Sequence, residues 1–280
     1  MQTSTSDQIR AAVRQAYGAV ATKDRQSSCC GGGSSCCGPT GSTSKQLGYT
    51  DADLAAVPEG ADLSLGCGNP HVIAGLRPGE RVVDLGSGAG FDAFLAAQQV
   101  GPTGHVIGVD MTPEMIERAK ANAVNTGLAH VDFRLGEIEH LPVEDASVDV
   151  IMSNCVINLA PDKPTVFSEA FRVLAPGGRL AIADVVAIGD IPAAIAADPV
   201  AYAGCVAGAA PVAELERMIA AAGFEYVRIV VQAQSHTLIE EWSPGSGAEQ
   251  FVASALIEAV KPARSHAVHT ARGHHNGGSS

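Results

Sequence analysis

The sequence predicts an α/β fold built on a doubly wound, mainly parallel sheet. Within residues 81–85, Val82, Val83 and Leu85 form a short apolar run, which suits a buried parallel strand. The glycine-rich turn Gly86-Ser-Gly-Ala-Gly90 follows it, and residues 91–97 then have the pattern of a helix. A second apolar run, residues 105–110, ends in an acidic residue. This order of strand, turn, helix and strand is typical of doubly wound sheets.

The glycine turn also predicts a ligand site. Glycine lacks a Cβ, so a ligand can approach the backbone N–H groups at the start of the helix. Asp110 ends the second strand, where an acid commonly holds the hydroxyls of a ribose. A dinucleotide-binding turn reads G-x-G-x-x-G, whereas Gly86, Gly88 and Gly90 read G-x-G-x-G after Asp84. The alternative is a plain glycine turn in another kind of enzyme.

Further strands and helices follow in the same alternating order. An amphipathic helix is expected at residues 8–22, packed over the core. Further strands are predicted at residues 131–135, 148–153, 179–185, 224–232 and 253–261, and further helices at 113–125, 167–174 and 212–222. The last two strands suit the antiparallel edge of the sheet. Residues 191–210 are alanine-rich, and we expect loops and short helices there, covering the strand ends.

Length and composition exclude several classes of protein. A chain of 280 residues, 46% hydrophobic and 17% charged, suits one sizeable packed domain with appendages. The formal net charge of −12 argues against binding to a phosphate backbone. Neither a membrane-spanning apolar run nor a signal peptide is recognisable. We therefore expect a cytoplasmic monomer with no nucleic-acid or membrane partner.

Seven cysteines are unusual for such a chain, and they favour metal, redox or catalytic use over disulfides. Four of them lie in a Gly- and Ser-rich segment that we expect to be a flexible loop, namely Cys29, Cys30, Cys36 and Cys37. Four sulfurs suit a zinc ion, but adjacent pairs lack the usual two-residue gap inside each pair. We therefore expect no structural metal. The four histidines after residue 262 suit either metal binding or, as we expect, a disordered end.

The other three cysteines are Cys67, Cys155 and Cys205. Ligands of doubly wound sheets bind at the carboxyl ends of the strands, so Asn154 and Cys155 should face them there. Cys67 lies between two glycines in a turn, where we expect an exposed thiol in a cleft; a small buried residue is the alternative. Burial as a structural residue is also the alternative for Cys155. Convergent thiolates suit a soft, thiophilic centre.

Residues Asp84-Leu-Gly-Ser-Gly-Ala-Gly90 resemble motif I of the class I S-adenosylmethionine-dependent methyltransferases. The resemblance implies a Rossmann-like, seven-stranded sheet that is mainly parallel with an antiparallel edge strand. It also implies that residues after the third strand contact adenine, although a solvated acidic turn is the alternative. The implied cofactor-binding residues are Asp84, Gly86, Ser87, Gly88, Gly90, Asp110, Met111, Glu137, Ile138 and Asn154.

Four segments look like those of arsenite methyltransferases: Leu65-Gly-Cys-Gly-Asn-Pro70, Asp84-Leu-Gly-Ser-Gly-Ala-Gly-Phe-Asp92, Ser153-Asn-Cys-Val-Ile-Asn-Leu159 and the segment at Gly204-Cys205. The resemblance covers roughly residues 8 to 261. In that family, cysteines matching Cys155 and Cys205 bind trivalent arsenic. Cysteines matching Cys67 and one nearer the N-terminus take part in binding or redox turnover. For the latter we prefer Cys36 and Cys37, which lie nearer Cys67 than the other pair does.

The resemblance implies methyl transfer from S-adenosylmethionine to thiolate-bound As(III), or to As(III) delivered as a thiol conjugate, for detoxification. A protein thiol pair would then reduce the oxidised arsenic, and thioredoxin or glutathione would reopen the resulting disulfide. Two other functions fit the residues. One is a methyltransferase of a small organic acceptor, and the other is a non-catalytic, thiol-rich metalloid-binding protein.

The predicted organisation has four parts. Residues 1–45 form an N-terminal helix and the Cys-rich loop, and residues 46–190 form the cofactor-binding core. Residues 191–261 cover the arsenic site and supply the edge strands. Residues 262–280 form the tail.

Overall fold

A computed structural model describes residues 6–22, 42–124, 126–196, 198–242 and 246–263. The four cysteines of the Cys-rich loop and the four histidines of the tail lie outside the described residues. The predictions made for them therefore stay predictions.

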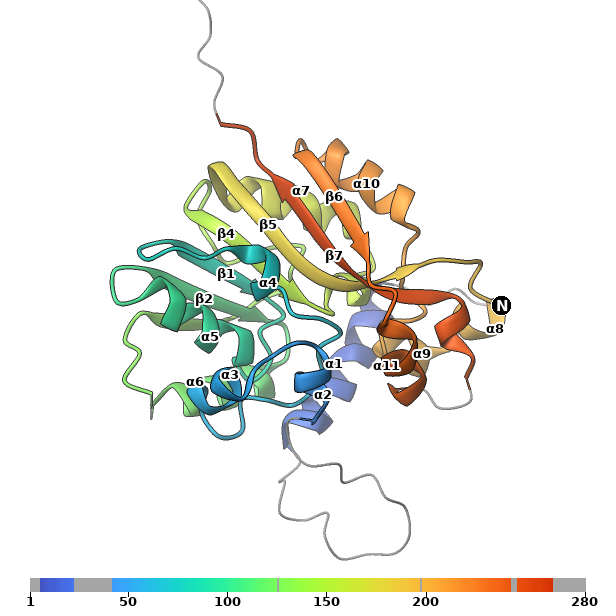
Figure 1. Ribbon diagram of the computed structural model, residues 1–280, viewed down its shortest axis with the longest axis horizontal. Helices are drawn as coiled ribbons and strands as arrows, with labels where there is room; N and C mark the ends of the chain where they lie inside the picture. Colours follow the sequence, from blue (N-terminus) through green and yellow to red (C-terminus); the bar gives the residue numbers. More distant parts are fainter. Residues whose placement is uncertain (1–5, 23–41, 125, 197, 243–245, 264–280) are drawn as a thin grey trace, which may run out of the picture.

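A seven-stranded sheet in the order β3-β2-β1-β4-β5-β7-β6 forms the centre of the fold (Figure 1). Its strands are β1 (Arg81–Leu85), β2 (His105–Asp110), β3 (Val131–Leu135), β4 (Val148–Asn154), β5 (Leu174–Ala187), β6 (Glu225–Val231) and β7 (Val252–Val260). Strands β1 to β5 pair in parallel, whereas β7 runs antiparallel to both β5 and β6. The predicted fold class, with antiparallel pairing at one edge, is confirmed.

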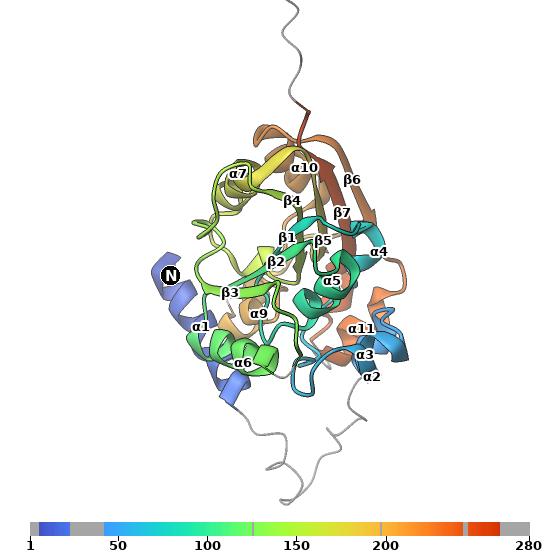
Figure 2. The ribbon, with the colours of Figure 1, turned by 90° about the vertical axis from the view of Figure 1, so that its left-hand side faces the viewer.

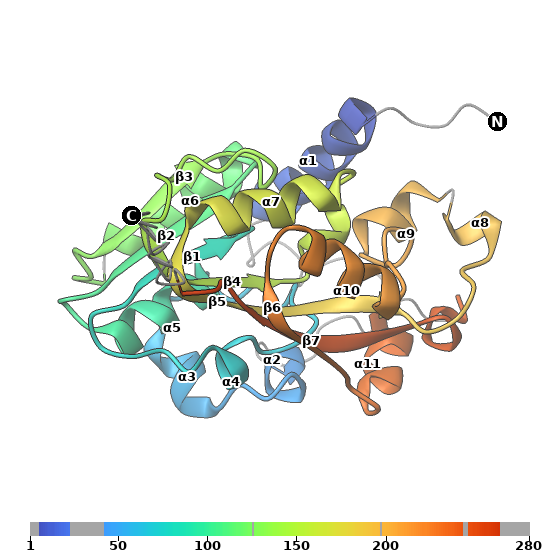
Figure 3. The ribbon, with the colours of Figure 1, turned by 90° about the horizontal axis from the view of Figure 1, so that it is seen from above.

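Helices cover both faces of the sheet. They are α1 (Ser6–Thr22), α2 (Ser42–Gln46), α3 (Asp51–Ala56), α4 (His71–Ala74), α5 (Phe91–Val100), α6 (Pro113–Val124), α7 (Lys163–Val173), α8 (Ala193–Ala196), α9 (Pro199–Ala203), α10 (Val212–Ala221) and α11 (Ser235–Trp242), with short 3-10 turns η1 (Ile157–Leu159) and η2 (Ala248–Gln250). Figure 3 shows α5 on one face of the sheet and α7 and α10 on the other.

Alternation along β1 divides the core between these two faces. Val82 packs with Phe94 of α5, whereas Val83 packs with Phe167 of α7. Successive side chains of a strand point to opposite faces, so a buried strand must be apolar on both. This explains why Val82, Val83 and Leu85 are all apolar.

Helix α1 lies beside α6 and α9, near the carboxyl ends of the central strands (Figure 2). Val13 of α1 is buried, and the Tyr17 hydroxyl donates a hydrogen bond to the Ala203 carbonyl of α9 at 3.1 Å. The predicted packing helix is therefore present, and it closes one side of the region where ligands of this fold bind. Among the described helices, none is long and apolar enough to cross a membrane.

Candidate active site

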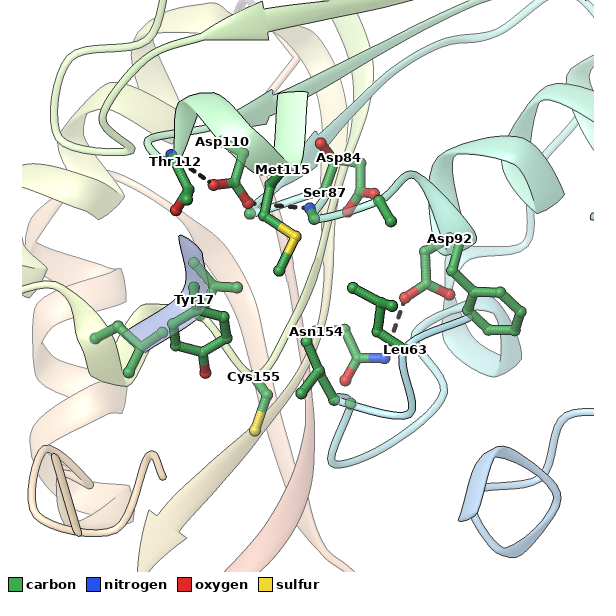
Figure 4. A pocket seen from close by; sticks show the side chains of 18 of the residues that line it. Tyr17, Leu63, Asp84, Ser87, Asp92, Asp110, Thr112, Met115, Asn154 and Cys155 are labelled. Atoms are coloured by element: carbon green, nitrogen blue, oxygen red, sulfur yellow. Dashed lines mark hydrogen bonds between the residues drawn. The ribbon is translucent and has the colours of Figure 1, made fainter. Parts of the chain in front are cut away.

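A cavity opens at the carboxyl ends of β1, β2 and β4, beneath α1 (Figure 4). It holds about 1070 Å³ of atom-free space, a figure that includes open solvent at its mouth. The polar side chains that line it include Asp84, Ser87, Asp92, Asp110, Asn154 and Cys155.

The glycine turn shapes the floor of this cavity. Gly86 has φ +66°, and a Cβ there would lie 2.2 Å from a methyl carbon of Val156, so only glycine fits. Gly88 has φ +52°, and a Cβ there would meet nothing closer than the Met115 sulfur at 3.9 Å. The turn therefore packs tightly on one side and leaves open space on the ligand side.

Asp110 joins the end of β2 to this turn. Its carboxylate accepts the Gly88 N–H at 3.0 Å and the Thr112 N–H at 2.8 Å. Burial raises the pKa of Asp110, and the backbone hydrogen bonds oppose that shift. The side chain is thus held in one orientation at the cavity, as an acid that binds ribose hydroxyls must be.

Asp84 Oδ2 and Ser87 Oγ are buried at the cavity and have no hydrogen-bond partner among the described residues. Burial raises the pKa of Asp84 well above its usual range, and the nearby carboxylates of Asp92 and Asp110 raise it further. Buried polar groups without partners are costly, and so are clustered carboxylates. A ligand with cationic groups and hydroxyls would relieve both costs. S-Adenosylmethionine has a sulfonium, an ammonium and ribose hydroxyls, so these residues fit it.

Asn154 links the cavity to the Cys67 turn. Its amide nitrogen lies at 3.1 Å from Asp92 Oδ2, 3.1 Å from the Tyr49 hydroxyl and 2.9 Å from the Gly68 carbonyl oxygen. Its amide oxygen accepts the Cys67 N–H at 3.0 Å. The side chain predicted to contact the cofactor therefore lines the cavity, but its polar atoms are bonded to the protein.

The structure brings together the three cysteines outside the Cys-rich loop. Cys67, Cys155 and Cys205 are all free, buried thiols. The Cys205 thiol donates a hydrogen bond to the Cys155 carbonyl at 3.0 Å. The sulfurs of Cys67 and Cys155 and a carboxylate oxygen of Asp184 lie within 4.8 Å of one another. Cys155 also lines the cofactor cavity, so this thiol cluster adjoins it.

The prediction that Cys67 is exposed in a cleft is wrong, because its residue is only 1% exposed. The flanking glycines explain why. A Cβ on Gly68 would lie 2.7 Å from the Ala183 Cβ, and one on Gly66 would lie 2.7 Å from the Asn154 amide nitrogen. The glycines therefore let the turn press directly onto the ends of the strands, which buries the thiol.

Burial keeps the three thiols protonated. It raises the pKa of Cys67 to about 12 and that of Cys155 well above the usual range. The hydrogen bond with Cys155, followed by burial, raises the pKa of Cys205. Burial also raises the pKa of Asp184 to about 6. The cluster therefore suits a thiophilic centre that displaces thiol protons as it binds.

Two of the predicted cofactor residues do not line the cavity, namely Gly90 and Glu137, whereas Met111 and Ile138 do. The Glu137 carboxylate instead accepts a hydrogen bond from Arg14 of α1 at 2.5 Å. Its neighbour Glu139 lines the cavity and pairs with Arg10 at 3.0 Å.

Sequence reasoning missed several lining residues, among them Arg10, Tyr17, Tyr49, Asp92 and Glu139. A signal existed for Asp92, an acid in the first turn of the helix that follows the glycines. The Tyr49 hydroxyl donates to Asp92 Oδ1 at 2.6 Å from 43 residues away, which no local pattern shows.

The strand order, the glycine turn at β1 and the acid at the end of β2 define a class I methyltransferase. Residues 76–223 match the sequence profile of a family described as a methyltransferase domain. An arsenite methyltransferase of Halobacterium salinarum is 51% identical over 92% of this chain and 68% of its own length. The chain belongs to the arsenite methyltransferase family.

Two further comparisons agree with this. An arsenite methyltransferase of Aquipseudomonas alcaligenes is 43% identical over 62% of this chain and 51% of its own length. The chain thus spans about half the length of that relative. A crystal structure of an arsenic(III) S-adenosylmethionine methyltransferase from Chlamydomonas reinhardtii superposes with a TM-score of 0.59, at 33% identity, covering 78% of this chain and 75% of its own.

Proposed function

We propose that this chain transfers methyl groups from S-adenosylmethionine to As(III) held by Cys155 and Cys205, with Cys67 as a third thiol. The observation that carries this proposal is the position of the buried thiol cluster, which shares Cys155 with the cofactor cavity. Detoxification of arsenic is the function that follows.

The cofactor's binding residues would be those of the glycine turn and its neighbours. Asp110 would accept the ribose hydroxyls, and the unpartnered oxygens of Asp84 and Ser87 would meet the polar groups of the methionine part. S-Adenosylmethionine, when bound, supplies an electrophilic methyl group. Met111 and Ile138, which also line the cavity, would provide apolar contacts.

The thiols would bind arsenic by exchange. Each Cys–SH replaces one hydroxyl of arsenous acid, forms an As–S bond and releases one water, so no charge has to be buried. As(III) bound by thiolates is pyramidal and keeps a lone pair, which is a nucleophile without a proton to lose. No general base is therefore needed, and the protein acts mainly by positioning, which is worth about 7–11 kcal/mol in the best intramolecular reactions.

Methylation oxidises the arsenic, and a pair of protein thiols would return it to the trivalent state by forming a disulfide. Cys67 and Cys155 are one such pair, because their sulfurs lie within 4.8 Å of each other. Cys36 or Cys37 remains our proposed N-terminal partner, and thioredoxin or glutathione the proposed reductant. A cytoplasmic location, a monomeric state and the four-part division of the chain also remain proposals.

The test is incubation of the purified protein with As(III), S-adenosylmethionine and a thiol reductant. Chromatography with elemental detection then separates the arsenic species. Methylated arsenic that requires both substrates, and is lost after thiol alkylation, would support the proposal. Unchanged As(III) with cofactor bound would contradict it and favour an organic acceptor. Bound As(III) with unconsumed cofactor would favour a non-catalytic protein.

A further inference from the structure

A second cavity lies across the Cys67 turn from the cofactor cavity. Gly66 lines the cofactor cavity, whereas Cys67 and Gly68 line the second one, so the turn forms a wall between them. The second cavity holds about 1100 Å³ of atom-free space, counting open solvent. It is bounded by the end of α2, by α11 and by β7, and Figure 2 shows α2 and α11 close together.

The lining of this second cavity is polar but nearly uncharged. It presents amide side chains, hydroxyls and a few apolar side chains, including Gln46, Asn69, Gln232, Thr237, Val72 and Leu238. Among the described residues that line it, Glu241 alone carries a charge. Such a surface favours a small molecule that hydrogen-bonds through hydroxyls or amides, and it disfavours an anion.

Cys67, one member of the thiol cluster, lines the inner wall of this cavity. The Cys67 carbonyl accepts a hydrogen bond from the Ser254 hydroxyl at 2.6 Å, and both residues line the cavity. The Cys67 sulfur in turn lies within 4.8 Å of the Cys155 sulfur. Cys67 thus belongs both to the lining of the second cavity and to the thiol cluster. A molecule bound in the second cavity would leave the cofactor cavity free for a nucleoside.

We propose that this second cavity binds a low-molecular-weight thiol, uncharged or cationic and bearing hydroxyl or amide groups, which reduces the disulfide of Cys67. The inference rests on the proposed function, which requires the protein thiols to be re-reduced after turnover, and it replaces glutathione, a net anion, by a small thiol without net negative charge as the reductant. The reductant would reach the Cys67 disulfide through the second cavity and not through the cofactor cavity. Reduction would therefore proceed while the nucleoside product is still bound.

The redox step balances with two thiols. A first thiolate attacks the Cys67 sulfur, which forms a mixed disulfide and releases the Cys155 sulfur, and that sulfur takes up a proton. A second thiolate attacks the external sulfur of the mixed disulfide, and Cys67 leaves as a thiol. The two electrons come from the two small thiols, which leave as their disulfide.

The test uses the full chain oxidised with diamide, in the absence of arsenic. Recovery of the Cys67 thiol is followed by isotope-coded alkylation and mass spectrometry after addition of 2-mercaptoethanol, an uncharged hydroxyl-bearing thiol. S-Adenosylhomocysteine at saturation blocks the cofactor cavity, and we expect it to leave the recovery rate unchanged.

Val72→Trp blocks the second cavity from its exposed rim, since Val72 is 68% exposed. We expect this variant to slow recovery on the order of tenfold, because thiol exchange depends on access to the attacked sulfur. Val124→Trp is the matched control, because Val124 is 81% exposed and does not line the cavity. Its recovery rate should equal that of the unchanged protein.

A second pair of variants tests the charge preference. Glu241→Lys should raise the rate with glutathione, which is a net anion, roughly threefold or more relative to 2-mercaptoethanol, as expected for an exposed charge contact. Glu240→Lys makes the same charge change next to the cavity rather than in its lining, and it should leave that ratio unchanged.

Three results would overturn the proposal. One is a recovery rate that S-adenosylhomocysteine suppresses and Val72→Trp does not change. Another is Cys67 that stays fully reduced in the diamide-treated protein. The third is the same ratio of recovery rates, with glutathione relative to 2-mercaptoethanol, in Glu241→Lys and Glu240→Lys. Arsenic methylation is measured separately with any effective reductant, so each of these results leaves the proposed methyl transfer to As(III) standing. Cys67 that stays reduced would also remove Cys67 and Cys155 as the pair that reduces the arsenic.

Discussion

The Cys205 thiol lies 3.0 Å from the carbonyl oxygen of Cys155, and both residues have left-handed backbones, with φ values of 63° and 60°. This conformation is costly for residues with a Cβ, and it persists only where the surroundings enforce it. The Cys155 N–H donates to the Ala183 carbonyl at 2.8 Å, and the Cys205 N–H donates to the Tyr202 carbonyl at 3.0 Å. The fold thus holds strained backbone at the two thiols proposed to bind arsenic.

Replacement of either thiol should abolish methylation of As(III). Cys155→Ser and Cys205→Ser each remove one As–S bond while keeping a side chain of similar size. We expect As(III) binding to weaken by roughly a hundredfold or more, since loss of a residue that only hydrogen-bonds to a metal ligand already costs up to about that much at metal sites. Bound arsenic is measured by elemental analysis after gel filtration, and methylarsenic by chromatography. Full turnover in either variant would contradict the assignment of that thiol.

Asp110→Ala should weaken the binding of S-adenosylhomocysteine and leave As(III) affinity nearly intact. Hydrogen bonds to a charged group contribute about 1.5–3 kcal/mol, which is roughly tenfold to a hundredfold in Kd. Calorimetric titration measures this. Glu137→Gln is the control that separates the two acids, because the Glu137 carboxylate pairs with α1 and does not line the cavity. Weaker cofactor binding in Glu137→Gln would support the contact between Glu137 and adenine that the sequence predicts.

The parallel strands β1 and β2 could be predicted almost residue by residue, because burial on both faces favours apolar residues on both, whereas β3 alternates apolar and charged residues. Strands β1, β2 and β3 have the predicted bounds. Strand β5 begins earlier than predicted, at Leu174, because that residue pairs with Val148 across an irregularity in the ladder. The short helices α2, α3, α4 and α11 were missed, since four to eight residues show too little periodicity.

Some residues of the site can likewise be predicted from the local sequence, whereas the positions of others depend on contacts with distant residues. The glycine turn and Asp110 are local features, so the sequence shows them directly. The burial of Cys67 depends on Ala183, more than a hundred residues away, and the position of Glu137 depends on Arg14 of α1. Contacts of this length have no periodic signal, and only the folded chain shows them.

Gly68→Ala should move Cys67 away from the other two thiols of the cluster without unfolding the sheet. The added Cβ would lie 2.7 Å from the Ala183 Cβ, so the Cys67 turn must move outward. We expect the alkylation rate of Cys67 to rise at least tenfold, because a thiol exposed by local opening reacts faster.

Gly189→Ala is the matched control for this variant. A Cβ on Gly189 would have its nearest contact at 3.7 Å, which is an ordinary van der Waals distance. Its Cys67 should react at the unchanged rate. Equal rates in Gly68→Ala and the unchanged protein would show that the turn tolerates a Cβ, and our account of the buried thiol would then fail.

Asp184 should give the protein a distinctive dependence of stability on pH. Its carboxylate accepts the Ile157 N–H at 2.8 Å, the Val185 N–H at 2.7 Å and the Asn158 amide at 2.9 Å, and burial nevertheless raises its pKa from 3.8 to about 6. Between these two values the folded state keeps a proton that the unfolded state has lost. The stabilisation is therefore fully present below about pH 4 and is lost as the pH rises to about 6.

The loss corresponds to about 3 kcal/mol, because each pKa unit is worth about 1.4 kcal/mol. Asp184→Asn has no titrating group, so the difference in unfolding free energy between the two proteins should shift in favour of the variant from pH 4 to pH 6 and then level off. Urea unfolding at pH 4, 5, 6 and 7 measures this difference, which also cancels the contributions of Asp84 and Asp110. A difference that is constant across these pH values would mean that Asp184 ionises as readily in the folded as in the unfolded chain.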